Sequence, residues 1–161
     1  AFLAAVAARA GEYNGFNLIA GDRESLWYLG SREGEAREIA PGVHGLSNHV
    51  LDEPWPKVIR GRHAMERALC EGDAVPALFE LLGDTAGVAD RELPSTGVGL
   101  EWERRLASPL ITGADYGTRA STVVSWTGAG EVFFEELTRA ADGSETGRAT
   151  QRFRLEAGRR A

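Results

Sequence analysis

The sequence contains a single cysteine, Cys70, among its 161 residues. One cysteine excludes a disulfide bond within the chain and any metal site that needs paired cysteine ligands. Because disulfides are typical of oxidising compartments, their exclusion weakly favours a reducing one, and we expect a cytoplasmic location. No apolar run approaches the roughly 20 residues that a membrane-spanning helix requires, so we expect no membrane span.

The sequence also lacks an excess of positive charge, since its formal net charge at pH 7 is -6. This balance gives no support for nucleic acid as a partner. The hydrophobic fraction of 43% and the charged fraction of 26% are ordinary for a globular protein. We therefore expect residues 1–161 to form a single domain with its own core.

Periodicity and turn residues predict several helices and strands. Short apolar runs rich in β-branched and aromatic residues predict strands, glycine and proline mark turns between them, and helical spacing predicts helices. The predicted helices are residues 1–10, 53–70 and 74–82. The predicted strands are 16–20, 25–30, 36–40, 43–47, 119–127, 131–137 and 149–155. Residues 83–118 are rich in glycine and proline and are expected to be a long loop.

The order of these elements predicts an α+β fold with antiparallel sheets and flanking helices. Connections of hairpin length join the strands, and parallel neighbours would need much longer crossovers.

Two arrangements that suggest catalysis fail on their spacing. His44 and His49 lie five residues apart around a turn, which is not the spacing of a helical metal site, and we expect no metal. Ser47, His49 and Asp52 contain the residue types of a hydrolase triad, but their segment is not a nucleophile elbow. No glycine-rich phosphate loop is present either, and we expect no cofactor.

Other polar residues lie in apolar or glycine-rich contexts, where a buried polar group needs a partner at a cost of about 1–3 kcal/mol if it has none. They could serve to cap turns and tie loops to strands, or they could line a binding site. The residues concerned are Asn14, Asn17, Asn48, Tyr116, Thr118 and Arg119.

Three segments, in order, resemble the NRDE family, which is also known through the transport and Golgi organisation protein 2 homologues. They are Tyr13–Ala20 (YNGFNLIA), Gly45–Asn48 (GLSN) followed by Pro54–Lys57 (PWPK), and Leu93–Thr122. The resemblance extends over nearly the whole chain. Family members carry a cysteine directly after the initiator methionine and an Asn-Arg-Asp-Glu motif near it, and neither is found here. The resemblance thus implies a C-terminal fragment of a family member that lacks its N-terminal segment, and that segment is an expected partner.

The family is similar in turn to N-terminal-nucleophile hydrolases, which implies a partial four-layer αββα sandwich and cleavage of a linear or cyclic amide C–N bond. In such enzymes the first residue attacks the carbonyl and its own α-amine serves as the base. The resemblance implies that Asn48 donates to the oxyanion or orients the substrate. It implies that Arg119 lies near the nucleophile, where it lowers the thiol pKa or holds a carboxylate.

A second hypothesis is non-catalytic, because the resemblance also implies handling of haem or of lipid such as acyl-CoA. We expect Asn48 and Arg119 to converge on one cavity. Under this second hypothesis that cavity would bind a small-molecule ligand, and His44, His49 or Tyr116 could contact haem. Under either hypothesis, the candidate binding residues are Asn14, Asn17, His44, Tyr116 and Thr118.

Overall fold

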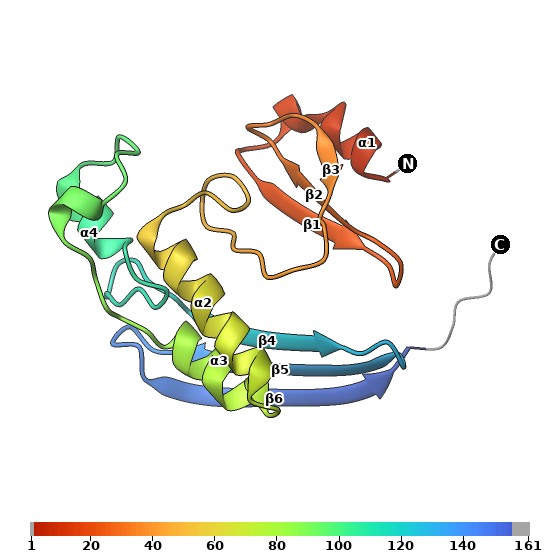
Figure 1. Ribbon diagram of the computed structural model, residues 1–161. Coiled ribbons are helices and arrows are strands. Elements are labelled where there is room, and N and C mark those ends of the chain that lie inside the picture. The colour runs from red at the N-terminus through yellow and green to blue at the C-terminus, as the bar shows by residue number, and fades with distance from the viewer. Residues whose placement is uncertain (1, 156–161) are drawn as a thin grey trace. The chain divides into compact units, whose positions relative to one another are not determined.

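A computed structural model describes residues 2–155, which fall into two units, residues 1–62 and 63–161 (Figure 1). These described residues contain two three-stranded antiparallel sheets and four α-helices. The fold is therefore α+β with antiparallel sheets, as the sequence predicts. The four-layer αββα arrangement stays a prediction. None of the helices in residues 2–155 is long and apolar enough to cross a membrane.

The first unit is built on a β-hairpin. Its strands β1 (Asn17–Gly21) and β2 (Leu26–Gly30) pair antiparallel, with Leu18 opposite Leu29. The strand β3 (Ala36–Glu38) adds to the other side of β2. The helix α1 (Phe2–Ala7) lies beside β3, and a short 3-10 helix, Ala10–Glu12, follows it.

The core of the first unit lies under β2. Tyr28 and Leu29 are completely buried, and Tyr28 clusters with Ile39 and Leu51. The helix α2 (Pro56–Cys70) begins three residues later than predicted, with a proline at its first position, where a missing N–H costs no hydrogen bond. Its first residues belong to this unit and the rest to the second.

The predicted strand 43–47 is wrong, because these residues form an irregular loop. Their backbone groups bind side chains instead of a neighbouring strand. Arg62 Nε donates to the carbonyl of Val43, Gly45 N donates to Asp52, and Asn17 donates to the carbonyl of Ser47. A segment whose hydrogen bonds are used in this way cannot join a sheet ladder.

The second unit is a three-stranded meander with helices. Pairing runs in the order β4-β5-β6, and β5 has a register shift at Thr138 and Arg139. The β4–β5 turn ends at Gly130, whose φ of 85° favours glycine. The elements that follow α2 are α3 (Ala74–Leu82), a 3-10 helix (Asp90–Glu92), α4 (Leu100–Arg105), β4 (Ala120–Trp126), β5 (Glu131–Arg139) and β6 (Glu145–Arg154).

The predicted loop 83–118 is wrong in part, because it contains α4 and the second 3-10 helix. Six residues are too few to show helical periodicity, so the sequence pattern predicts neither α4 nor the shorter 3-10 helix. Glu103 on α4 is nevertheless buried, and its carboxylate accepts the Thr96 N–H at 2.6 Å and the Thr96 hydroxyl at 2.7 Å. This long segment is thus held by its own contacts.

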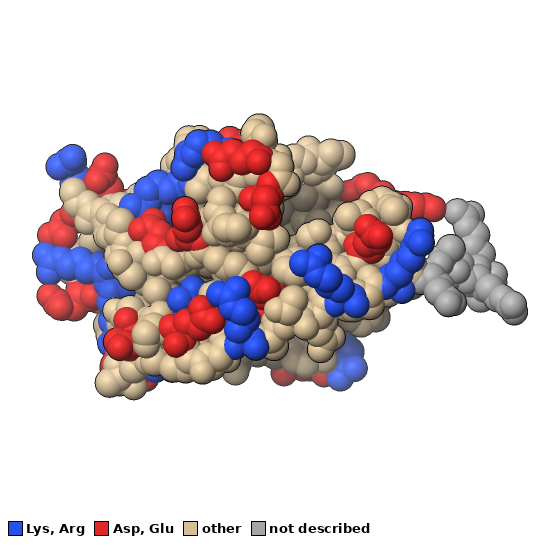
Figure 2. All heavy atoms as spheres, turned by 90° about the horizontal axis from the view of Figure 1, so that it is seen from below, with Lys and Arg blue, Asp and Glu red and all other residues tan. Residues whose placement is uncertain are grey.

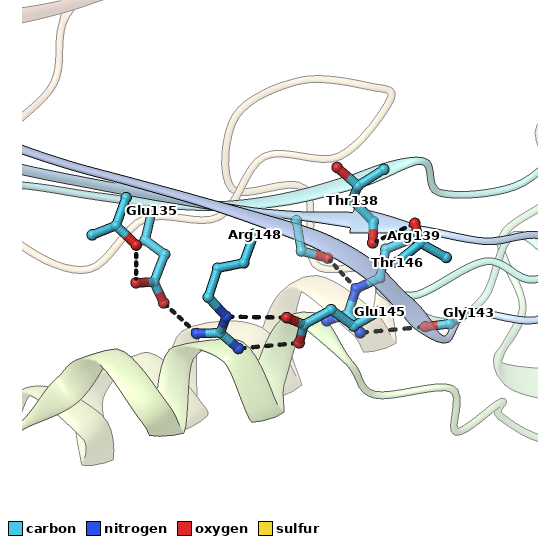
Figure 3. A network of polar contacts seen from close by, with 9 residues as sticks. Glu135, Thr138, Arg139, Gly143, Glu145, Thr146 and Arg148 are labelled. Atoms are coloured by element: carbon cyan, nitrogen blue, oxygen red, sulfur yellow. Dashed lines mark hydrogen bonds and ion pairs between the residues drawn. The ribbon is translucent and has the colours of Figure 1, made fainter.

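The helix α3 lies against β4. A network of ion pairs and hydrogen bonds links the strands β5 and β6 (Figure 3). Glu135 on β5 is buried, and it accepts hydrogen bonds from Arg148 at 2.6 Å and Thr150 at 2.8 Å. Arg148 also binds Glu145, and its guanidinium lies 5.7 Å from the ring of Phe79 on α3. On the face shown in Figure 2, basic and acidic residues are interspersed, and neither sign forms a large patch.

Because Glu135 is buried and would keep only Thr150 as a partner, Arg148→Ala is expected to lower the free energy of unfolding by about 1–3 kcal/mol, the cost of a buried charge that has lost its ion pair. Urea unfolding monitored by circular dichroism measures this. The matched control is Glu145→Ala, which removes only the exposed partner of Arg148 and should cost under about 1 kcal/mol. Equal losses for the two variants would contradict the role of Glu135.

Candidate functional site

Asp52 closes an eight-residue loop in the first unit, which we call the clamped loop (Gly45–Asp52). The Asp52 N–H donates to the Gly45 carbonyl at 2.8 Å, and Asp52 Oδ1 accepts the Gly45 N–H at 2.9 Å. Asp52 has a φ of 63°, a left-handed conformation that costs a non-glycine residue about 1–3 kcal/mol. The reciprocal bonds offset that cost and bring the two ends of the loop together.

His44 bonds to the second oxygen of the same carboxylate. Its Nδ1 lies 2.6 Å from Asp52 Oδ2, and its Nε2 lies 2.9 Å from the Ala40 carbonyl. Both nitrogens therefore face acceptors, which only the doubly protonated ring can satisfy. The hydrogen bond to Asp52, with that to Ala40, raises the pKa of His44. Burial opposes ionisation of Asp52, but the hydrogen bonds from His44 and Gly45 outweigh it and lower its pKa.

The start of α2 packs against the base of the clamped loop. Arg62 donates to the Val43 carbonyl and places Nη1 3.8 Å from Asp52 Oδ1. A Cβ atom on Gly45 would lie only 2.7 Å from Cγ1 of Val58. This close approach requires glycine at position 45.

A relay of two side chains holds the middle of the clamped loop. The buried Tyr28 hydroxyl donates to Asn17 Oδ1 at 2.7 Å, and Asn17 Nδ2 donates to the Ser47 carbonyl at 3.4 Å. Asn17 therefore joins β1 to the residue before Asn48. Both of its polar atoms have partners within the fold.

Asn48 follows Ser47 in the clamped loop. Its side chain is exposed and makes no hydrogen bond to any described residue. The carboxamide is thus free to donate to a ligand from a loop that is tied at both ends and at Ser47. Asn14 is likewise exposed and unbonded among residues 2–155, but no side-chain contact fixes its position.

Arg119 lies just before β4 in the second unit. Its guanidinium donates to the carbonyls of Gly113 at 3.1 Å and Thr118 at 3.5 Å. It is exposed, and no carboxylate among the described residues pairs with it. An exposed guanidinium with neutral partners can bind an anion without first breaking an ion pair.

The segment beside Arg119 is fixed by its own contacts. Thr118 Oγ1 accepts the Ile111 N–H at 3.0 Å, so Thr118 is tied within the fold. The Tyr116 ring packs edge-on against Trp102 with centroids 5.5 Å apart. Arg105 lies 4.9 Å from the Trp102 centroid and binds Asp115, whose pKa this hydrogen bond lowers to about 2.

The structure therefore places the predicted residues in two sets. Asn17, His44 and Asn48 meet at the clamped loop in the first unit, and Tyr116, Thr118 and Arg119 lie in one segment of the second. The convergence of Asn48 and Arg119 on one cavity stays a prediction. The sequence analysis did not identify Asp52 and Arg62 as residues that hold the loop. The only sequence feature that pointed to Asp52 was its position seven residues after Gly45.

The arrangement of His44 does not suit haem ligation. A haem iron needs an imidazole nitrogen with a free lone pair, and both nitrogens of His44 face protein acceptors.

The contribution of the His44–Asp52 pair to stability is expected to depend on pH. Since the pKa of folded His44 is raised, its contribution is complete below about pH 6.5, the unfolded value, and is lost as pH rises through the folded value. The Asp52 pKa is lowered, so its contribution is lost in acid, below about pH 4. Urea unfolding of the protein and of His44→Gln should differ by about 1 kcal/mol at pH 6 and by less at pH 9. A difference that grows toward pH 9 would contradict the imidazolium assignment.

Gly45→Ala is expected to destabilise the protein by about 1–3 kcal/mol, because its Cβ would overlap Val58. Thermal unfolding measures this loss. The control is Gly11→Ala, since a Cβ at Gly11 would meet nothing within 4 Å. If both variants unfold at the same temperature, the close packing of α2 on the clamped loop is not required.

Comparisons with known proteins confirm the family resemblance of the sequence. Residues 1–141 match the family model described as "Transport and Golgi organisation 2". The chain is 35% identical over 173 aligned positions to a bovine (Bos taurus) "Transport and Golgi organization protein 2 homolog", an alignment that covers 96% of this chain.

Mouse (Mus musculus) and human (Homo sapiens) relatives, which bear closely similar names, are 32% identical over 139 positions and 77% of this chain. The alignments span 62% of the bovine relative and 50% of the mouse and human relatives. The family model covers well over half of this chain, and the chain belongs to the transport and Golgi organisation 2 family.

Proposed function

We propose that this chain supplies the substrate-orienting part of an amidohydrolase of the N-terminal-nucleophile type. The Asn48 carboxamide donates to the oxyanion that forms when an amide carbonyl is attacked. Arg119 holds an anionic group, either a carboxylate of the substrate or the thiolate of the nucleophile. The proposal assigns the nucleophile to a cysteine outside these residues, at the start of a longer chain, and it retains the predicted cytoplasmic location.

The unbonded carboxamide of Asn48 on a clamped loop carries this proposal. An oxyanion-hole donor must be free in the resting protein and must not reorganise during the reaction. Asn48 meets the first requirement, because its side chain binds no described residue. The Asp52–Gly45 bonds and the Asn17–Ser47 bond support the second, because they fix the backbone on both sides of Asn48.

Arg119 contributes positive charge at the second position. Its neutral partners hold the guanidinium in place without neutralising it. In a site that excludes water, such a charge favours a thiolate over a thiol and a bound carboxylate over a free one.

An alternative is a non-catalytic carrier of haem or acyl-CoA. Arg119 favours this reading too, because its guanidinium would pair equally well with a propionate or a phosphate. The exposed rings of Trp102 and Tyr116 lie in the same unit and would offer apolar contact area. Iron ligation by His44 forms no part of this alternative.

The test uses a longer chain that includes the leading cysteine, assayed with a panel of N-acyl amino acids. We expect Asn48→Ala to lower kcat by roughly 10²–10³-fold with little change in KM, as for loss of an oxyanion donor. Arg119→Ala should instead raise KM for the substrates that carry a carboxylate. The matched control is Gln151→Ala, which removes an exposed carboxamide on β6 and should leave both constants unchanged.

The 161-residue chain alone should show no turnover above a blank, and turnover would refute the assignment of the nucleophile. If the longer chain hydrolyses none of the amides but binds haem or acyl-CoA with an affinity that falls in Arg119→Ala, the carrier alternative is correct. If haem binds, we expect its Soret band to be the same in His44→Ala, because both ring nitrogens of His44 already bind protein acceptors.

A further inference from the structure

The first unit contains a cavity of about 800 Å³ that the proposed reaction does not use. Its walls come from α1, the β1–β2 turn, Trp27 of β2 and the start of β3. Its volume falls in the range of about 300–1,000 Å³ that is usual for sites of small molecules. Helix and sheet contribute mainly alanine and glycine to its walls, among them Ala4, Ala7, Ala20 and Ala36. These small side chains leave the space open.

Trp27 supplies the aromatic surface of the cavity. It lies on β2 opposite Ala20 of β1, and its side chain is 37% exposed. Its Nε1 donates to Ser25 Oγ at 3.1 Å, which fixes the ring and satisfies the indole N–H. A fixed indole in an open cavity offers contact area to an apolar ligand and attracts a cation to its face.

The charge of the cavity wall is negative. Asp22 and Glu35 line it, and no lysine or arginine within residues 2–155 does. The backbone N–H groups of Glu24 and Ser25 donate to Asp22 and lower its pKa, which keeps it ionised at neutral pH. Glu35 makes no ion pair or hydrogen bond with any described residue, so its charge is not neutralised by the protein.

From this combination we propose that the cavity binds a small apolar amine, with its hydrocarbon against the alanines and Trp27 and its ammonium group toward Glu35. The charge of the wall disfavours carboxylates and phosphates, so this site would not take the anionic ligands proposed for Arg119. The inference is therefore independent of the proposed function.

Binding of three matched probes, n-hexylamine, n-hexanol and hexanoate, tests the proposal on the 161-residue chain. Saturation-transfer NMR and calorimetry at low ionic strength measure it. We expect hexylamine to bind severalfold more tightly than hexanol and hexanoate not to bind, and we expect added salt to weaken only the amine. Equal binding of the amine and the carboxylate, or no binding of the amine, would overturn the proposal.

Two variants locate the site, with one control. Glu35→Gln should weaken hexylamine about two- to fivefold, as expected for an exposed ion pair, and leave hexanol unchanged. Ala4→Leu should fill the cavity and abolish binding of both. The control is Glu131→Gln, which removes the same charge from an exposed residue of β5 in the second unit that does not line the cavity. Equal weakening by Glu35→Gln and Glu131→Gln would show that general charge, not this cavity, attracts the amine.

Discussion

The carboxylate of Asp52 is the constraint on which the first unit's candidate site depends. One of its oxygens binds the Gly45 N–H and the other binds the His44 ring, while its own N–H returns to the Gly45 carbonyl. Three interactions thus converge on one residue whose backbone is in a conformation that most side chains avoid. Its strain persists because each of these bonds would be lost if the backbone relaxed.

This arrangement explains why the loop can carry a functional amide. Loops usually owe their mobility to a lack of contacts, and a mobile amide would be a poor catalytic donor. Here the base is closed by Asp52, the middle is tied by Asn17, and Tyr28 in the core holds Asn17 in turn. The side chains of Tyr28 and Asn17 therefore connect the buried sheet to the backbone next to Asn48. Asn17 and His44 act as supports in this scheme, and Asn48 is the residue left free.

In the second unit, arginine side chains make several of the stabilising contacts. Arg105 is paired with Asp115 and stacked beside Trp102, and Arg148 is paired with the buried Glu135. Arg119 differs from both, because only carbonyl groups hold it. Position in the fold, not residue type, therefore separates the arginine proposed to bind an anion from those that stabilise the unit. Glu35 is an acidic counterpart of Arg119, since it lines a cavity and no basic side chain of the described residues pairs with it.

The sequence by itself determined the elements that local patterns encode and the family. The hairpin of β1 and β2, the helix α3 and the strand β5 follow from short apolar runs with glycine breaks, because strand and helix periodicity depend only on near neighbours. Only the tertiary structure decided the state of residues 43–47, which look like a strand but lose their backbone bonds to Asp52, Arg62 and Asn17. It alone also engaged both nitrogens of His44 and left Asn48 and Arg119 without a side-chain partner among residues 2–155. These outcomes depend on residues distant in sequence meeting in space, and no local pattern records such meetings.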